Sequence, residues 1–151
     1  MAHEDYFALA ADEARKATCG RAKCGSVIIS VKGEVIGRGW NGPPAELASQ
    51  RRCERRGELS ETFKSDRTCC VHAEWRAIID ALRLYPVEVK GATLYFTRVN
   101  EVGEMIFSGE PYCTICSKLA LEVGLSGFAL WHESGIKIYD TVDYNDRSFS
   151  A

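Results

Sequence analysis

The sequence predicts an α/β fold in three layers, with a mixed sheet of four to five strands between helices. Three observations lead to this prediction: an amphipathic helix opens the chain, an apolar hairpin occupies residues 24–40, and a helix followed by a strand occurs twice within residues 72–131. Helices that alternate with strands cover both faces of a sheet, and a hairpin adds antiparallel strands to it. At this length we expect a single domain over residues 1–151.

The first part of the chain contains a helix and a hairpin. Residues 3–17 carry apolar side chains such as Phe7 on one face, and acidic residues precede basic ones, which suits the helix dipole. Apolar, β-branched runs at 24–31 and 34–40 predict two strands joined by a short turn. Pro43-Pro44 stops the second strand, because proline cannot donate a hydrogen bond to a sheet.

The second part repeats a helix–strand pattern. Apolar residues at helical spacing predict helices over 72–84 and 113–123, which are followed by strands over 91–97 and 125–131. A short fifth strand is expected at 136–139, and beyond it the tail is polar and aromatic without a clear period.

The composition is that of an ordinary globular protein, with 46% hydrophobic and 26% charged residues. The net charge of −2 gives no electrostatic basis for a nucleic-acid partner, and no apolar run approaches the roughly 20 residues that span a membrane. The N-terminus lacks the basic and apolar regions of a signal peptide, so we expect a cytoplasmic location. Seven cysteines in such a chain favour metal ligation over disulfides.

Two short motifs carry the predicted chemistry. His72-x-Glu74 opens one helix, and Cys113-x-x-Cys116 opens the next. The histidine and the two cysteines are three zinc ligands, which leaves the fourth tetrahedral position for water, as in catalytic zinc sites. Taken alone, the thiols also suit a redox pair or half of a structural zinc site, and His72 suits a core histidine. The combination in this order favours a catalytic Zn²⁺ site.

Glu74 is the candidate catalytic residue. It follows His72 by two residues, so it can reach a water at the metal without being a ligand. Because zinc lowers the pKa of a bound water toward ~7, a carboxylate beside it can take the proton and pass it to a leaving nitrogen.

Other polar residues have open interpretations. His3 is expected at the surface, and His132 is either an ordinary polar strand end or a residue that faces the site. An arginine cluster after the hairpin is either a solvated face or a phosphate clamp, because guanidinium groups match phosphate oxygens. The cluster comprises Arg51, Arg52, Arg55 and Arg56.

These motifs resemble those of the cytidine and deoxycytidylate deaminase superfamily, whose zinc signature is His-x-Glu followed by Pro-Cys-x-x-Cys. The resemblance covers roughly residues 5–132 and is strongest for the deoxycytidylate (dCMP) deaminase branch. The matching segments are Cys24-Gly25-Ser26-Val27-Ile28, Gly39-Trp40-Asn41-Gly42, Val71-His72-Ala73-Glu74, Thr93-Leu94-Tyr95 and Cys113-x-x-Cys116. The resemblance implies a cytidine-deaminase-like fold and a hydrolase of nucleotide metabolism.

The resemblance further implies zinc-dependent hydrolytic deamination of an amino-pyrimidine at the ring carbon that bears the amine. The implied metal ligands are His72, Cys113 and Cys116, with Glu74 as the proton shuttle and Asn41 and Ala73 as substrate contacts. The partner would be a small-molecule nucleotide or nucleobase, and members of the family tend to form homo-oligomers.

The chain departs from the family pattern in three places. Tyr112 is an extra residue before Cys113, and residues 98–110 are inserted where the family's strand runs almost directly into the metal loop. We expect the insertion to be a loop or a small hairpin that flanks the pocket and influences the substrate. The tail over 133–151 is expected to be too short for the family's last helix and strand together.

Four further cysteines echo positions that bind a second, structural zinc in some family members. They are either ligands of such a second zinc or reduced, buried thiols, since free cysteine is among the most buried residue types. The four are Cys19, Cys53, Cys69 and Cys70.

Three functions are compatible with the sequence. The favoured one is a pyrimidine nucleotide deaminase that converts a dCMP-like substrate into dUMP and ammonia. The second is a deaminase of another nucleoside, a free base, a pterin-like ring or a tRNA adenosine, which the insertion and Tyr112 suggest. The third is a structural zinc domain, in which the Glu74 carboxylate would have no catalytic role.

Overall fold

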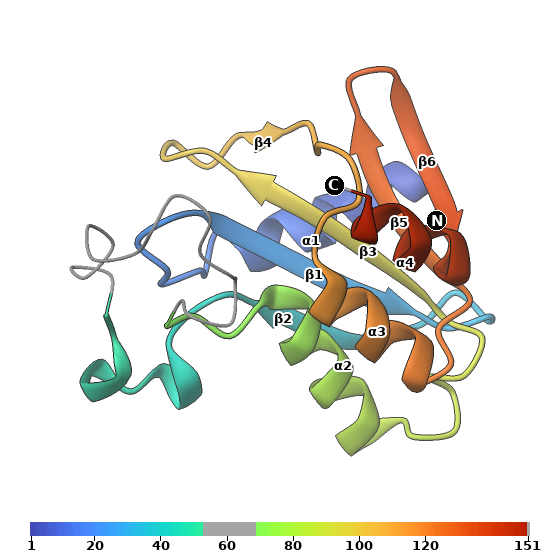
Figure 1. Ribbon diagram of the computed structural model, residues 1–151, viewed down its shortest axis with the longest axis horizontal. Coiled ribbons are helices and arrows are strands. Elements are labelled where there is room, and N and C mark those ends of the chain that lie inside the picture. The colour runs from blue at the N-terminus through green and yellow to red at the C-terminus, as the bar shows by residue number, and fades with distance from the viewer. Residues whose placement is uncertain (53–68, 151) are drawn as a thin grey trace.

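A six-stranded mixed sheet forms the middle layer of the structure, with helices on both faces (Figure 1). The computed structural model describes residues 1–52 and 69–150. Its elements in chain order are α1 (His3–Ala14), β1 (Lys23–Ile29), β2 (Val35–Trp40), the short 3-10 turns η1 (Pro44–Glu46) and η2 (Ala48–Gln50), α2 (Ala73–Leu84), β3 (Thr93–Val99), β4 (Met105–Ile106), α3 (Thr114–Glu122), β5 (Gly127–His132), β6 (Gly135–Asp140) and α4 (Thr141–Phe149). The three-layer α/β/α prediction is confirmed, and the predicted element boundaries differ by three residues or fewer.

The strands follow the order β2-β1-β3-β5-β6, with β4 paired to β3 at one end. The predicted hairpin is confirmed, because β1 and β2 pair antiparallel from Gly25 opposite Trp40 onward. β3 and β5 are parallel, and α3 makes the crossover between them. β6 pairs with β5 over six positions, so the fifth strand is longer than predicted.

The inserted segment 98–110 is a small hairpin, and it adds a sixth strand to the predicted four or five. β4 pairs with the end of β3, with Arg98 opposite Ile106. Asn100 closes the turn, since its side-chain oxygen accepts hydrogen bonds from the backbone N–H groups of Val102 and Glu104. Of the two alternatives that the sequence left open, a loop or a small hairpin, the structure has the hairpin.

The prediction that the tail is too short for a strand and a helix is wrong, because β6 and α4 fit within residues 135–149. The side chain of Asp140 caps α4 by accepting from Val142 N at 2.9 Å. Only Thr141, Tyr144 and Ser148 of α4 are buried, and just one of them is strongly apolar. The helix is mostly polar, so its sequence resembles that of an exposed segment without regular structure.

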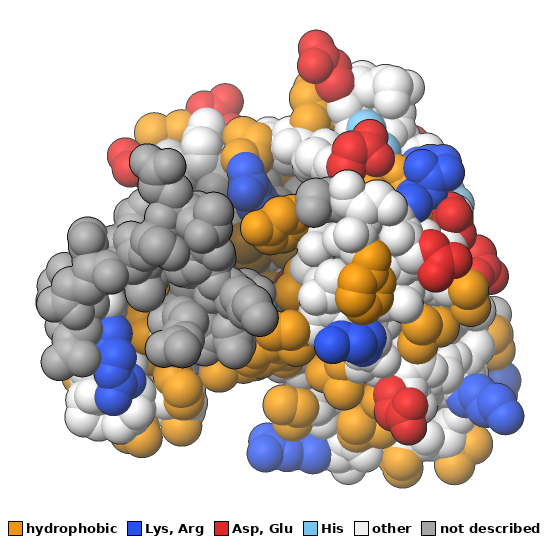
Figure 2. Space-filling model, in the orientation of Figure 1, with side chains coloured by type: hydrophobic (Ala, Val, Ile, Leu, Met, Phe, Trp, Pro, Cys, Tyr) orange, Lys and Arg blue, Asp and Glu red, His pale blue; other side chains and the backbone are white. Residues whose placement is uncertain are grey.

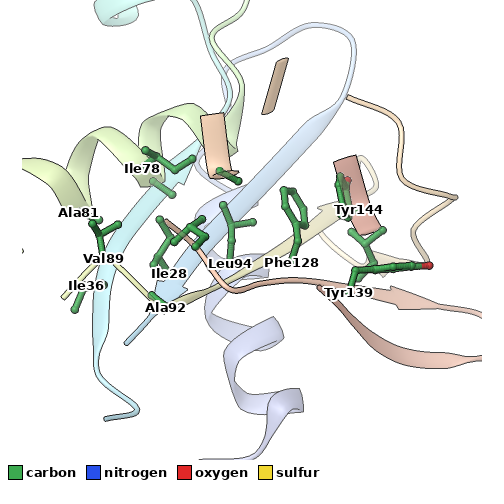
Figure 3. Close-up of a cluster of buried hydrophobic side chains, with 14 residues drawn as sticks. Ile28, Ile36, Ile78, Ala81, Val89, Ala92, Leu94, Phe128, Tyr139 and Tyr144 are labelled. Atoms are coloured by element: carbon green, nitrogen blue, oxygen red, sulfur yellow. The ribbon is translucent and has the colours of Figure 1, made fainter. Parts of the chain in front are cut away.

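The core covers both faces of the sheet. On one face, Ile28, Leu94 and Phe128 of the sheet point toward the helical layer that contains Ile78 and Tyr144 (Figure 3). On the other face, α1 packs its Phe7 and Ala10 against the sheet. The rings of Phe128 and Tyr144 stack with centroids 3.8 Å apart, which fixes α4 to β5.

Gly39 of β2 allows α2 to lie close to the sheet. A Cβ atom at this position would sit 2.3 Å from the carbonyl oxygen of Ala73, in the first turn of α2. Glycine is required here by this close approach, which sets the position of the residues that begin α2.

Within the described ranges, 1–52 and 69–150, we find no helix that combines the length and the apolar character needed to cross a bilayer.

Candidate active site

A pocket of about 670 Å³ lies where the N-termini of α2 and α3 meet the sheet. Its walls come from the start of each helix, from β1 and β3, and from the segment that joins β4 to α3. Figure 2 shows the face of the molecule that is hollowed near its centre at this place. The volume falls in the range of pockets that bind small organic ligands.

The two sequence motifs meet at the bottom of this pocket. His72 and Cys113 are the N-cap residues of α2 and α3, so their side chains project from the two helix starts. His72 Nδ1 lies 3.2 Å from Cys116 Sγ and 3.4 Å from Cys113 Sγ. All three ligand atoms lie within 4.8 Å of one another, so sequence positions far apart converge as predicted.

This group fits a zinc ion. A tetrahedral site with Zn–N of about 2.0 Å and Zn–S of about 2.3 Å places its ligand atoms about 3.5 Å apart, close to the two distances observed. Three protein donors at a pocket leave one position open, which distinguishes a catalytic zinc site from a closed structural one.

The side chains of the group shift one another's pKa values in different directions. A hydrogen bond from Cys116 lowers the pKa of Cys113 to about 4, with His72 adding to the effect, which favours the thiolate form that binds metal. Burial raises the pKa of the Cys116 thiol, and the neighbouring Cys113 charge raises it further. For His72, burial lowers the pKa, but the hydrogen bond to Cys113 and the charge of Glu74 outweigh it and raise the pKa overall.

Glu74 lies beside this group in the first turn of α2. Its side chain is buried, with 6% of the residue exposed, and it lines the pocket. Burial raises the pKa of the Glu74 carboxyl, and the His72 charge opposes that shift. A carboxyl group whose pKa is raised in a pocket is suited to accept and return a proton.

Asn41 and Ala73 both line the pocket. Asn41 Oδ1 accepts from Cys24 N at 2.8 Å, and Asn41 Nδ2 donates to Ala22 O at 2.8 Å. These bonds fix the asparagine side chain against β1. Each of its two polar atoms can make one more hydrogen bond, which would be available to a ligand.

The other histidines lie away from the metal-binding group. His3 is exposed, as predicted, and its Nδ1 lies 2.7 Å from the Tyr95 hydroxyl. His132 Nδ1 donates to the Ser108 carbonyl at 3.0 Å, and Nε2 lies 2.8 Å from the Tyr139 hydroxyl. His132 is therefore a hydrogen-bonded strand end and does not line the pocket.

The predicted arginine cluster is only partly described. Arg51 Nη1 donates to the Thr18 carbonyl and Arg52 Nη1 donates to the Gln50 carbonyl, and neither residue lines the pocket. Arg55 and Arg56 lie outside the described residues, so their part of the clamp hypothesis stays a prediction.

Three residues that line the pocket were not predicted from the sequence: the basic Arg21 and Arg98, and the aromatic Tyr144. Arg98 is at the end of a strand, and Tyr144 is on the unpredicted α4. The alternation of side chains along β3 could have placed Arg98 from the sequence alone, because Arg98 lies on the same face of the strand as Leu94 and Phe96.

The cysteines proposed for a second zinc are partly brought together. Cys69 Sγ lies 3.9 Å from Cys70 Sγ, and a hydrogen bond from Cys70 lowers the pKa of Cys19 to about 5. Cys53 lies outside the described residues. In the described part of the chain, His72, Cys113 and Cys116 form the one group of three metal donors found, so the second zinc stays a prediction.

Comparisons with known proteins point to a family of zinc-binding deaminases. A sequence profile described as the cytidine and deoxycytidylate deaminase zinc-binding region matches residues 1–130. A deoxycytidylate deaminase of Mycobacterium phage D29 is 33% identical over 129 residues, across 81% of this chain and 88% of the phage protein.

Solved structures share the fold. A cytidine deaminase from Burkholderia pseudomallei superposes with a TM-score of 0.62 at 16% identity, over 95% of this chain and 96% of that chain. The apo dCMP deaminase of cyanophage S-TIM5 superposes with a TM-score of 0.53 at 19% identity, over 85% of this chain and 82% of that chain. Fold and site together define a zinc-dependent hydrolytic deaminase. The chain belongs to the cytidine and deoxycytidylate deaminase family.

Proposed function

We propose that this protein deaminates a pyrimidine nucleotide of the dCMP type, converting the amino-pyrimidine and water into dUMP and ammonia. The observation that carries the proposal is the buried carboxyl group of Glu74 beside the His72, Cys113 and Cys116 donors in an open pocket. The phage relative named deoxycytidylate deaminase supports the nucleotide substrate. So does a cyanophage dCMP deaminase solved with dCMP and dUMP, which has the same fold.

In this proposal His72, Cys113 and Cys116 hold the zinc ion. When bound there, zinc would supply Lewis acidity and lower the pKa of a water molecule. Glu74 takes a proton from the attacking water and delivers it to the pyrimidine ring nitrogen. The Glu74 carboxylate then takes the second proton from the new hydroxyl group on the ring carbon and transfers it to the exocyclic amine, which leaves as ammonia. Burial of Glu74 supports both transfers, because its raised pKa lies nearer to that of the groups with which it exchanges protons.

The substrate contacts in this proposal are Asn41 and the backbone of Ala73. Asn41 is held by Cys24 N and Ala22 O, so a ligand would meet a side chain that is already oriented. Such preorganisation lowers the entropic cost of positioning the substrate.

The experiment that tests the function is an ammonia-release screen with zinc-loaded protein across dCMP, dCTP, cytidine, cytosine, guanine and pterins. We expect dCMP to be the best substrate. Glu74→Ala should retain zinc and lose on the order of 10²- to 10⁴-fold in rate. Glu122→Gln, an exposed acid on α3, is the matched control and should leave the rate unchanged. If zinc stays bound and Glu74→Ala releases ammonia at the wild-type rate from every substrate, the catalytic role is wrong.

A different amino-heterocycle is the second candidate substrate. The observation that favours it is the placement of the inserted segment, since Ser108, Gly109 and Tyr112 all line the pocket. Tyr112 is 69% exposed and lies at the pocket wall. The same screen separates the candidates, because a nucleoside, base or pterin would then exceed dCMP in kcat/KM. The homo-oligomer and the cytoplasmic location stay predictions.

A further inference from the structure

Arg98 is placed on the pocket side of β3 by the pairing of the sheet. It lies opposite Cys24 in the antiparallel β1–β3 ladder, and both residues line the pocket. Side chains directly opposite each other in a sheet share a face and lie about 5 Å apart at Cβ. Burial raises the pKa of the half-buried Cys24 thiol, and the positive charge of Arg98 lowers it by a smaller amount, which agrees with this proximity.

The guanidinium group of Arg98 has capacity to bind a ligand. It makes no hydrogen bond or ion pair with residues 1–52 or 69–150, and the side chain is exposed. Phe96, two residues earlier on the same face, also lines the pocket. Because a strand rises about 3.3 Å per residue, Arg98 stands ~7 Å farther along the strand than Phe96.

Ser108 provides a second, independent observation. Its hydroxyl oxygen is buried and has no hydrogen-bond partner among the described residues, although the residue lines the pocket. The backbone of Ser108 is fixed at both ends: its N–H donates to Trp131 O at 2.8 Å, and its carbonyl accepts from His132 Nδ1 at 3.0 Å. A buried hydroxyl without a partner is costly, and a ligand oxygen would satisfy it.

The charges around the pocket leave this side basic. Arg21 also lines the pocket, and its charge acts on both His72 and Cys24. Glu110 lines the pocket as well, but its charge acts on Tyr139 and Arg147, which belong to β6 and α4. The acid at the metal-binding group is Glu74, at the buried end.

We propose that Arg98 and Ser108 bind the 5′-phosphate of the substrate, an inference that rests on the proposed nucleotide deaminase function. A guanidinium fork suits two phosphate oxygens, and a serine hydroxyl donates to a third. The inserted hairpin is then a specificity element, because it carries Ser108 and pairs with the strand end that carries Arg98. The phosphate site therefore lies at the pocket, away from Arg51 and Arg52, which donate to backbone carbonyls of the 18–50 region.

The test compares dCMP with deoxycytidine, which lacks the phosphate, in steady-state ammonia release. For Arg98→Gln we expect kcat/KM on dCMP to fall on the order of 10- to 100-fold, mainly through KM, with kcat/KM on deoxycytidine unchanged. Ser108→Ala should show the same selective loss in kcat/KM on dCMP, on the order of 3- to 10-fold. Arg98→Lys keeps the charge but loses the fork and should fall between wild type and Arg98→Gln.

Two matched controls and a binding measurement keep the result interpretable. Arg83→Gln, an exposed arginine of α2 away from the pocket, should behave as wild type on both substrates. Arg52→Gln tests the rival phosphate clamp and should also behave as wild type. Calorimetric titration with dUMP and with deoxyuridine measures affinity without turnover, so Arg98→Gln should weaken only dUMP binding.

Several outcomes would overturn the inference. An Arg98→Gln variant that loses both substrates equally, or neither, removes Arg98 from phosphate binding, as does a selective loss in Arg52→Gln. These outcomes leave wild-type activity on dCMP intact and so leave the proposed function standing. A wild-type protein that deaminates no phosphorylated substrate would instead contradict the proposed function, and the inference with it.

Discussion

The imidazole ring of His72 stacks on the indole ring of Trp75, with ring centroids 4.4 Å apart and planes only 7° from parallel. The two residues lie at the start of α2, one helical turn apart in the chain. Stacking restricts the rotation of the imidazole and holds Nδ1 toward Cys113 and Cys116. Trp75 therefore acts as a positioning residue for the proposed zinc ligand.

We expect Trp75→Leu to weaken zinc binding by roughly 10-fold or more, since residues that orient metal ligands typically contribute 10- to 100-fold in affinity. Trp75→Phe keeps an aromatic face and should lose less. Competition against a chromophoric chelator measures both affinities. Equal zinc affinity in wild type and Trp75→Leu would show that stacking does not orient His72.

Removal of zinc should destabilise the fold. The ligands come from two helices, so a bound ion joins α2 to α3 and binds the folded state alone. At free zinc 100 times the dissociation constant, the free energy of unfolding should rise by about 2.7 kcal/mol. Thermal unfolding with chelator and after zinc is restored checks this. A Cys116→Ser variant should show a smaller zinc-dependent shift, and an unchanged melting temperature after verified zinc removal would contradict the prediction.

Glu46 holds the turn after β2 against α2. Its carboxylate accepts from Trp40 Nε1 at 2.9 Å and from Arg76 Nη1 at 2.7 Å, and Thr18 donates to its other oxygen. Ala45 and Glu46 both have positive φ, 54° and 57°, a conformation that costs energy in residues other than glycine. The carboxylate therefore holds a strained turn in place.

The contribution of Glu46 should depend on pH. Burial raises the pKa of Glu46, but the hydrogen bonds from Thr18, Arg76 and Trp40 outweigh it, so the pKa lies below 4.5. A pKa that is lower in the folded state stabilises the protein above the unfolded value and loses this effect as pH falls through the folded one.

We therefore expect Glu46→Gln to reduce the free energy of unfolding by about 1 kcal/mol near pH 7, because the carboxylate is partly exposed and screened. The difference from wild type should shrink as the pH falls below about 4.5. Urea denaturation between roughly pH 3.5 and pH 8 measures this difference in the free energy of unfolding. Exposed Glu101→Gln is the control, and a pH-independent difference would rule out the charge as the cause.

α4 contacts α3, the helix that carries Cys116, through a small cluster of polar side chains. Ser117 Oγ donates to Asn145 Oδ1 at 2.7 Å and lies 3.1 Å from Ser148 Oγ, in a buried contact between α3 and α4. Asn145→Ala leaves this polar cluster incomplete, and we expect a loss of about 1–2 kcal/mol in the free energy of unfolding. Exposed Asp146→Ala should cost less than about 0.5 kcal/mol. Equal stability of the two variants in urea denaturation would show that the contact is not needed.

Much of the metal site could be predicted because its motifs are local. His72 and Glu74 share the first turn of one helix, and Cys113 and Cys116 share the start of another, so a few neighbouring residues fix their relative positions. The β-hairpin and α2 were likewise predictable, because their apolar side chains follow periods of two and 3.6 residues.

The helix α4 and the pocket rim could not be predicted in the same way. α4 turns mostly polar side chains outward and depends on contacts of Tyr144 with Phe128 and of Asn145 with Ser117. Arg98 meets Cys24 only because β1 and β3 pair in one particular register. None of these three contacts leaves a pattern within a short stretch of sequence.

The amino-acid sequence by itself thus predicted the metal-binding group and the candidate catalytic residue, through residue types at short spacing on two helix starts. The tertiary structure decided which side chains face that chemistry, because strand order and register bring Arg98, Ser108 and Tyr144 to one pocket from separate parts of the chain. Short-range spacing is fixed by helix geometry, whereas long-range contact depends on the packing of the whole sheet.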